Sequence, residues 1–422
     1  MTATPETARA DGAETAISGA ELTLDDVTKR YPGQKAAAVD GLSLTIPAGE
    51  IVMFVGPSGC GKTTSLKMIN RLIEPTSGTI TIGGEDVRGR SADELRRHVG
   101  YVIQGGSLFP HMSVARNISI VPKLLGWDAK RTSTRVDELL DLVGLDPARY
   151  RDRYPRELSG GQQQRVGVAR GLAADPPVIL MDEPFGAVDP ITRQRLQDEL
   201  LSIQRELRKT IVCVTHDIDE AIKLGDRIVI LREGAEIAQY DTPEKILAAP
   251  ADDFVSDFVG SGSTLKQLSL ARVSEISLEE RPTCTVGERV ADVLARAERT
   301  GHDSVVVLDD RRRPQGWPWL RQLRGETVPA FDHEQLDSLD SRATLNDALD
   351  TMLTSGHGAA VVTGDRDQYL GVIGFAAVTE HIRVLQEESA ARRTDPTTGP
   401  EPTVGPTSRT TDAGTGVDGR DG

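Results

Sequence analysis

The sequence predicts an α/β fold in two parts, a larger domain followed by a smaller one, and two observations support this prediction. From about Glu21 to residue 262, short apolar runs alternate with helix-favouring stretches, which is the pattern of a sheet covered by helices. From residue 263 to Leu385, an imperfect internal repeat follows. The length of 422 residues agrees with two or three domains of roughly 100–200 residues each.

Within the first part, short apolar runs of buried-strand length predict the strands of a sheet. These are Ile51–Val55, Val178–Met181 and Ile211–Thr215, with a hairpin formed by Arg227–Leu231 and Ala235–Tyr240. The stretch from about Ala92 to residue 160 is charged and favours helix, so we expect a helical subdomain there.

The second part contains two copies of one pattern, TVGERVADVLARAERTGHDSVVVLDDRRRPQGW and TLNDALDTMLTSGHGAAVVTGDRDQYLGV. Each copy reads as an amphipathic helix, a turn of small residues and two short strands, which predicts a small pseudo-symmetric α/β module over residues 263–385. Residues 1–20 and 386–422 lack apolar periodicity, so we expect both to be disordered tails.

Composition excludes several classes of function. The net charge of −15 argues against nucleic acid as the main partner, because phosphate binding requires a basic surface. No run approaches the roughly 18 apolar residues of a membrane span, and we find no secretory signal. The three cysteines are too few and too scattered for a disulfide framework or a zinc site, which favours a reducing compartment.

A phosphate-binding loop follows the first buried strand. The residues match the pattern G-x-x-x-x-G-K-T, with an apolar strand before them and a helical pattern after them. The glycines allow backbone N–H groups to point at phosphate oxygens, Lys62 supplies positive charge, and the Thr63 hydroxyl is placed to bind Mg²⁺. The predicted ATP-binding residues of this loop are Gly56, Pro57, Ser58, Gly59, Cys60, Gly61, Lys62, Thr63 and Thr64.

Two carboxylates end the strand that begins at Val178. Asp182 is suited to bind the metal ion, and Glu183 is suited to activate the attacking water as a general base. A phosphate-binding loop earlier in the chain requires such a pair. The sequence therefore predicts ATP hydrolysis with Mg²⁺ as cofactor.

Between these two motifs, the chain resembles the ATP-binding subunits of ABC transporters. The residues Leu158-Ser-Gly-Gly-Gln-Gln-Gln-Arg165 look like the ABC signature. Ser159 is suited to cap a helix whose positive end binds a γ-phosphate. The resemblance covers about Leu22 to Gly260 and implies an ABC-type P-loop ATPase domain with a RecA-like core, a helical subdomain and an antiparallel β-part. The signature residues that it assigns to ATP are Ser159, Gly160, Gly161 and Gln162.

Four further residues stand where the family pattern expects them. Tyr31 corresponds to the aromatic residue that stacks on adenine. Gln104 corresponds to the glutamine that contacts the metal or water, and with Thr63 and Asp182 it completes the implied metal set. Asp189 corresponds to the D-loop aspartate, although Val188 replaces the usual leucine before it. His216 corresponds to the switch histidine that holds the γ-phosphate.

The resemblance also implies partners. Two subunits sandwich two ATP molecules as a homodimer, and separate membrane permease chains hold the subunits at the cytoplasmic face of the membrane. An extracytoplasmic solute-binding protein then acts indirectly. The permease groove would involve the segment Gly105–Met112, and the alternative is that Leu108 and Phe109 simply pack under the helical subdomain.

Two features are similar to the importers of quaternary amines such as glycine betaine, carnitine, choline and proline betaine. The first is the sequence Asn70-Arg-Leu-Ile-Glu74, and the second is the repeat, which resembles a tandem CBS pair. Nucleotide-binding CBS repeats show Thr or Ser followed by Asp three positions later, whereas this chain has Gly374 and Ala377 in the second copy. The first copy has Trp319 and Gln322 there, so the module is degenerate. Two alternatives remain: an importer ATPase for an amino acid or anion, and an ABC ATPase without a transport role.

Overall fold

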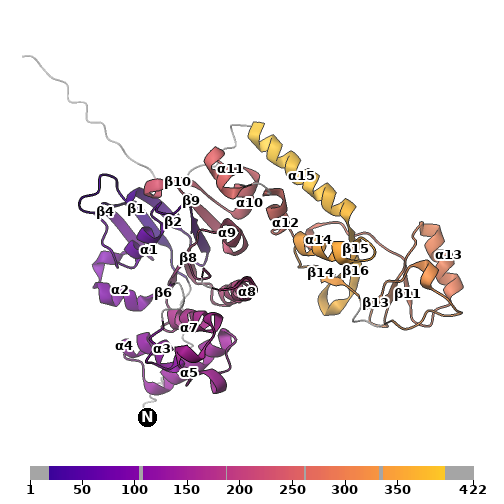
Figure 1. Ribbon diagram of the computed structural model, residues 1–422, viewed down its shortest axis with the longest axis horizontal. Helices are drawn as coiled ribbons and strands as arrows, with labels where there is room; N and C mark the ends of the chain where they lie inside the picture. Colours follow the sequence, from indigo (N-terminus) through magenta and orange to yellow (C-terminus); the bar gives the residue numbers. More distant parts are fainter. Residues whose placement is uncertain (1–18, 104–107, 187, 261–262, 332–335, 395–422) are drawn as a thin grey trace, which may run out of the picture.

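The computed structural model describes residues 19–103, 108–186, 188–260, 263–331 and 336–394. Figure 1 shows a large region that contains β1 to β10 and a smaller one that contains β11 to β16. Among the described residues, none of the helices has the length and apolar character of a membrane span.

The centre of the large region is a six-stranded sheet in the order β10-β9-β3-β8-β7-β6. All neighbouring strands are parallel except β10, which is antiparallel to β9. The sheet confirms the strands expected from apolar runs. Its members are β3 (Ile51–Val55), β6 (Val99–Ile103), β7 (Val178–Asp182), β8 (Thr210–Val214), β9 (Arg227–Leu231) and β10 (Ile237–Asp241).

Strand β6 corrects one expectation. The stretch from Ala92 onward was expected to be helical, but Val99–Ile103 forms an edge strand that pairs in parallel with β7. The strand is short, and Gly100 and Tyr101 interrupt its apolar residues. Its extended conformation therefore depends on hydrogen bonds to a neighbour that lies about 80 residues later in the chain.

A second, antiparallel sheet in the order β2-β1-β4-β5 packs against the central sheet. Alternate residues of β3 face two different cores, because successive side chains of a strand point to opposite sides. Val52 and Phe54 pack with the antiparallel sheet, whereas Met53 and Val55 pack with the helices. The strands of the second sheet are β1 (Leu22–Lys29), β2 (Val39–Ile46), β4 (Ser77–Ile82) and β5 (Glu85–Asp86).

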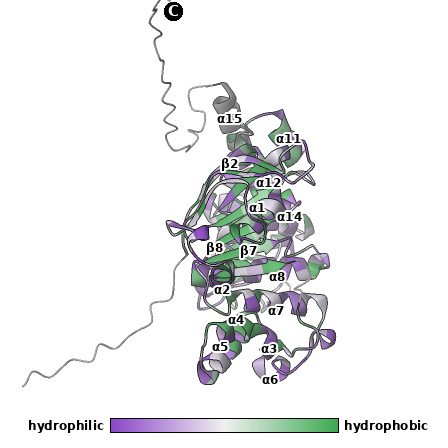
Figure 2. Cartoon of the chain, turned by 90° about the vertical axis from the view of Figure 1, so that its left-hand side faces the viewer, coloured by the Kyte–Doolittle hydropathy of each residue, from purple (hydrophilic) through white to green (hydrophobic). Residues whose placement is uncertain are grey.

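Helices α3, α4, α5 and α7 gather at one end of this region (Figure 1), and Figure 2 shows the apolar strands in its interior. The helices before this group are α1 (Lys62–Ile69) and α2 (Ala92–His98). The group itself contains α3 (Val114–Ile118), α4 (Ile120–Leu124), α5 (Ala129–Leu142), α6 (Pro147–Tyr150) and α7 (Gly160–Leu172). The later helices are α8 (Pro190–Leu207), α9 (Ile218–Leu224), α10 (Pro243–Ala248) and α11 (Asp253–Val259).

The smaller region contains two three-stranded sheets with the same pattern. In each, the first two strands are parallel and joined through a helix, and the third is antiparallel to the second. The first copy contains β11 (Thr283–Thr285), α13 (Val290–Thr300), β12 (Val306–Leu308) and β13 (Pro314–Gly316). The second contains β14 (Ser338–Asp340), α14 (Leu345–Thr354), β15 (Ala359–Thr363) and β16 (Tyr369–Gly374).

The two sheets share one apolar core, in which Val306 and Trp317 of the first copy pack with Val361 and Tyr369 of the second. Two further helices, α12 (Ser263–Leu268) and α15 (Phe375–Thr394), both contact α10 of the large region. Lys266 of α12 adds an ion pair of 2.8 Å to Asp219 of α9.

Candidate active site

The loop between β3 and α1 has the backbone that phosphate binding requires. Gly56, Gly59 and Gly61 adopt positive φ angles of 151°, 85° and 110°. A Cβ atom on Gly61 would lie 2.6 Å from the carbonyl oxygen of Ala38, so no larger residue fits there without displacing the backbone. Positive φ, and at Gly56 and Gly61 close packing as well, thus explain the glycines, and they shape a loop of the kind that binds phosphate groups.

Lys62 lies over this loop. Its Nζ donates hydrogen bonds of 2.7 Å to the carbonyl of Gly56 and 3.0 Å to that of Pro57, and it lies 3.7 Å from the buried Sγ of Cys60. Only 7% of Lys62 is exposed. These bonds hold the ammonium group at the loop, where phosphate oxygens can replace the carbonyl acceptors.

The predicted metal ligands Thr63 and Asp182 lie together, although 118 residues separate them in sequence. The Thr63 hydroxyl donates a 3.0 Å hydrogen bond to Oδ1 of Asp182, the last residue of β7. Burial raises the pKa of the Asp182 carboxyl above its ordinary value, and the Thr63 hydrogen bond partly opposes that shift. A hydroxyl and a carboxylate at the end of a buried strand are oxygen donors of the kind that Mg²⁺ prefers.

Glu183 and His216 also lie together. Glu183 has a φ of 45°, which is rare for a residue with a side chain, and its N–H donates to Val214 of β8. This bend follows β7 and brings Oε1 to 3.3 Å from Nδ1 of His216. A base next to a histidine at the end of β7 and β8 is the arrangement expected for water activation.

The support of His216 includes residues that sequence reasoning missed. The Thr215 hydroxyl donates to the carboxylate of Glu220, and Nε2 of Gln197 donates to the same carboxylate at 3.2 Å. The Thr215 hydroxyl also accepts the N–H of Asp217 at 3.1 Å. Glu220 is only 7% exposed and its pKa is raised, chiefly by burial. The sequence Thr-His-Asp-x-x-Glu, with Asp217 as the helix cap, could have predicted that Glu220 lies next to Thr215.

None of the contacts among the described residues joins Tyr31, Ser159 or Asp189 to this group. Ser159 caps α7 with a capping box that includes Gln162, and Ser159 and Gly160 are exposed. Asp189 caps α8 by accepting the N–H of Thr192, and hydrogen bonds from Thr192 lower its pKa. Tyr31 follows β1, with Nζ of Lys29 5.2 Å from its ring centre. The remaining signature residue, Gly161, is buried. Gln104 falls outside the described residues.

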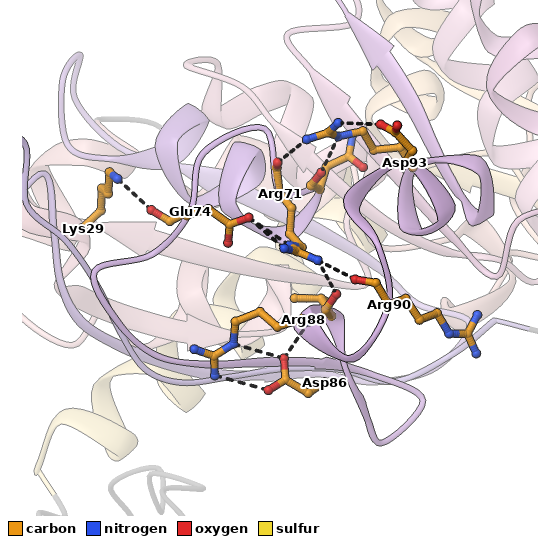
Figure 3. A network of polar contacts seen from close by, with 10 residues as sticks. Lys29, Arg71, Glu74, Asp86, Arg88, Arg90 and Asp93 are labelled. Atoms are coloured by element: carbon orange, nitrogen blue, oxygen red, sulfur yellow. Dashed lines mark hydrogen bonds and ion pairs between the residues drawn. The ribbon is translucent and has the colours of Figure 1, made fainter.

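The turn after α1 connects the phosphate-binding helix to the antiparallel part of the domain. Arg71 has a φ of 48° and donates to the carboxylate of Glu74 and to the carbonyls of Val87 and Arg90 (Figure 3). Arg96 of α2 donates in turn to the carbonyl of Arg71. The sequence Asn-Arg-Leu-Ile-Glu therefore has a structural role in this turn.

A glycine cradle with a buried lysine, a hydroxyl–carboxylate pair and a strained glutamate beside a histidine define an ATPase of the P-loop class. The ABC transporter family model matches residues 39–186, which include the phosphate-binding loop, the signature and both carboxylates.

Similar proteins make the assignment more specific. The chain is 46% identical to the choline transport ATP-binding protein OpuBA of Bacillus subtilis over 85% of this chain and 95% of that protein. It is 49% identical to the osmoprotectant import ATP-binding protein OsmV of Salmonella typhimurium, over 72% and 80% of the two chains. The structure of cbiO1 from Clostridium perfringens, part of an ABC transporter complex, aligns with a TM-score of 0.50 and 26% identity. That alignment covers 58% of this chain and 97% of cbiO1. The chain belongs to the ATP-binding subunits of ABC transporters.

Proposed function

We propose that this chain hydrolyses ATP to drive the import of a quaternary-amine osmoprotectant, such as glycine betaine, choline or carnitine, through a separate membrane permease. The observation that carries the proposal is the similarity to OpuBA, which extends over 85% of this chain and includes the C-terminal region. The glycine betaine/carnitine/choline transport ATP-binding protein OpuCA of Bacillus subtilis is 44% identical over the same share.

In the proposed reaction, the loop around Lys62 binds the β- and γ-phosphates, and the carboxylate of Glu183 takes a proton from the attacking water. His216 orients Glu183 and contacts the γ-phosphate. Thr63 and Asp182 are proposed to hold Mg²⁺, together with Gln104. When bound, the metal ion neutralises charge on the phosphate oxygens.

We further propose that two copies of the chain close around two ATP molecules. The signature end of α7 supports this, because Ser159 and Gly160 are exposed while the hydrogen bonds of the cap are internal to the helix. Free N–H groups at the start of a 13-residue helix attract a phosphate, and a second copy would supply it.

A groove suited to a permease helix lies beside α3 and α4. It has a volume of about 320 Å³, and Tyr101, Phe109 and Val121 line it. Phe109 is 45% exposed, whereas the neighbouring Leu108 packs against the core, so the two residues have different environments. The buried Asn117 holds the Phe109 backbone with bonds of 2.8 and 3.2 Å. We propose that a permease segment binds here and keeps the chain at the membrane.

The C-terminal region is proposed to be a degenerate tandem CBS module with a regulatory role. The repeated strand–helix–strand–strand pattern and the shared core of its two sheets support this proposal.

Replacement of Glu183 by Gln tests the catalytic part of the proposal. We expect turnover to fall by at least about a hundredfold, because the general base is lost while the shape of the side chain is kept. ATP and Mg²⁺ should then hold the variant as a dimer in light scattering after size exclusion. Replacement of the exposed Glu206 by Gln is the control. Wild-type turnover in Glu183→Gln would refute the assignment of the base.

Uptake of labelled choline and glycine betaine tests the solute. A strain lacking this chain and other betaine uptake systems should recover uptake with the wild-type chain and not with Glu183→Gln. A labelled amino acid serves as the comparison. Recovery of amino-acid uptake without recovery of choline or betaine uptake would overturn the proposed solute class.

A further inference from the structure

A cavity of about 400 Å³ lies between the two copies of the C-terminal repeat, away from the ATP site. Trp317 follows β13 of the first copy, and His357 lies in the turn between α14 and β15 of the second. Phe331 and Asp337 also line the cavity. The volume falls within the roughly 300–1,000 Å³ typical of small-molecule sites.

The aromatic residues at this cavity are held rigidly. The His357 ring stacks between Trp317 and Trp319, with ring centres 4.1 and 4.5 Å apart and planes inclined by 6° and 16°. Nε1 of Trp317 donates a 3.1 Å hydrogen bond to the buried Ser304. Because the rings are already ordered, a ligand would not have to order them on binding.

Phe331 adds a further aromatic wall through a glycine contact. A Cβ on Gly316 would lie 2.7 Å from Cγ of Phe331, so the ring packs directly on the glycine backbone. Because Gly316 has no side chain, the Phe331 ring can lie next to Trp317, and both aromatic residues line the cavity.

The electrostatics of the wall favour a cation. Among the described residues that line the cavity, Asp337 is the only one with a formal charge at neutral pH. Burial lowers the pKa of His357 below its ordinary 6.5, so the ring is neutral there. Among the described lining residues, an anion would meet no cationic side chain, whereas a cation would meet the Asp337 carboxylate and aromatic side chains.

Apart from the carboxylate of Asp337, the side-chain oxygens of the described wall already accept hydrogen bonds, which narrows the choice of cation. Oε1 of Gln322 accepts the N–H of Trp319 at 2.8 Å, and Oγ of Ser355 accepts the N–H of His357 at 3.2 Å. A primary ammonium group would bring three N–H donors that need acceptors, whereas a quaternary ammonium group brings none. The buried Nε2 of His357 has no hydrogen-bond partner among the described residues, and a ligand hydroxyl would supply one.

We propose that this cavity binds a small quaternary ammonium cation carrying a hydroxyl group, with Asp337 and the aromatic wall as its recognition elements. The binding itself does not depend on the proposed import function. If both hold, the imported class of solute would bind the chain that drives its import, and the module would act as a sensor of that solute.

Titration of the full-length chain with choline chloride tests the proposal. Of the three tryptophans, Trp317 lines the cavity and Trp319 stacks on His357, which also lines it. Replacement of Trp127 by Phe removes the third, which stacks with Arg131 in the helical part of the large region. We expect a saturable change in tryptophan fluorescence, with sodium chloride keeping the ionic strength constant. Ethanolamine, the primary-amine counterpart of choline, should bind at least about tenfold more weakly.

Replacement of Asp337 by Asn is the decisive variant. Because the Asp337 side chain is exposed, we expect the variant to fold like the wild type. We expect the affinity for choline to fall about tenfold. Replacement of Asp310, another exposed carboxylate of the same module, by Asn should leave the affinity for choline unchanged. No saturable response to choline, equal binding of ethanolamine, or equal affinities of the two variants would each overturn the proposal. Uptake by the wild-type chain is measured separately, so failure here is distinct from failure of the import proposal.

Discussion

Replacement of Glu220 tests whether the hydrogen bonds of Thr215 and Glu220 hold His216, the proposed switch histidine, in place. The carboxylate accepts hydrogen bonds from the Thr215 hydroxyl and from Nε2 of Gln197, and it is 7% exposed. Glu220→Ala leaves both donors without this acceptor, at about 1–3 kcal/mol each. Relief from burying the carboxylate offsets part of that cost. We therefore expect the free energy of unfolding to fall by about 2–4 kcal/mol.

The pH dependence separates the charge of Glu220 from its shape. Because burial raises its pKa in the folded chain, the folded state binds more protons than the unfolded state between the ordinary 4.5 and the raised value. Stability from this group is present below that window and is lost as the pH rises through it. Glu220→Gln cannot titrate, so its stability relative to the wild type should increase as the pH rises above about 4.5.

Urea unfolding and ATPase assays measure these effects on the full-length chain. Glu220→Gln keeps an acceptor for Thr215, so its ATPase activity should exceed that of Glu220→Ala, which we expect to lose at least about tenfold in kcat. Glu206→Ala is the control, because Glu206 is exposed on α8. An unfolding free energy of Glu220→Ala within about 0.5 kcal/mol of the wild type would refute the reasoning.

Three further predictions concern the phosphate-binding loop and the turn after α1. Lys62→Ala should weaken ATP binding at least about tenfold, as measured with a fluorescent ATP analogue, whereas unchanged affinity would contradict its role. Gly61→Ala should cost more stability than Gly59→Ala in urea unfolding. Both have positive φ, but only a Cβ on Gly61 meets the Ala38 carbonyl, and equal losses would show that this contact is unimportant. Arg71→Ala should cost about 1–3 kcal/mol by the same measurement, because two backbone carbonyls lose their donor, and Arg71→Lys should recover little of it.

The local sequence predicted the elements whose chemistry is contained in a short motif. The phosphate-binding loop requires glycine, lysine and threonine at fixed spacing, and the continuous segment Gly56–Thr64 contains them at that spacing. The strands β3, β7 and β8 were recognisable because they are buried on both faces, which makes them continuous apolar runs. Such features depend on neighbours in sequence, so the sequence by itself determined them.

Tertiary structure decided the features that depend on distant partners. Strand β6 is extended because it pairs with β7, and Glu220 became a buried acceptor because α8 brings Gln197 next to it. The aromatic cavity exists because two repeats pack face to face and bring Trp317 to His357. In each case the stabilising free energy comes from hydrogen bonds or packing between segments far apart in the chain. Local residue patterns cannot predict such contacts, because they depend on which distant segment packs alongside.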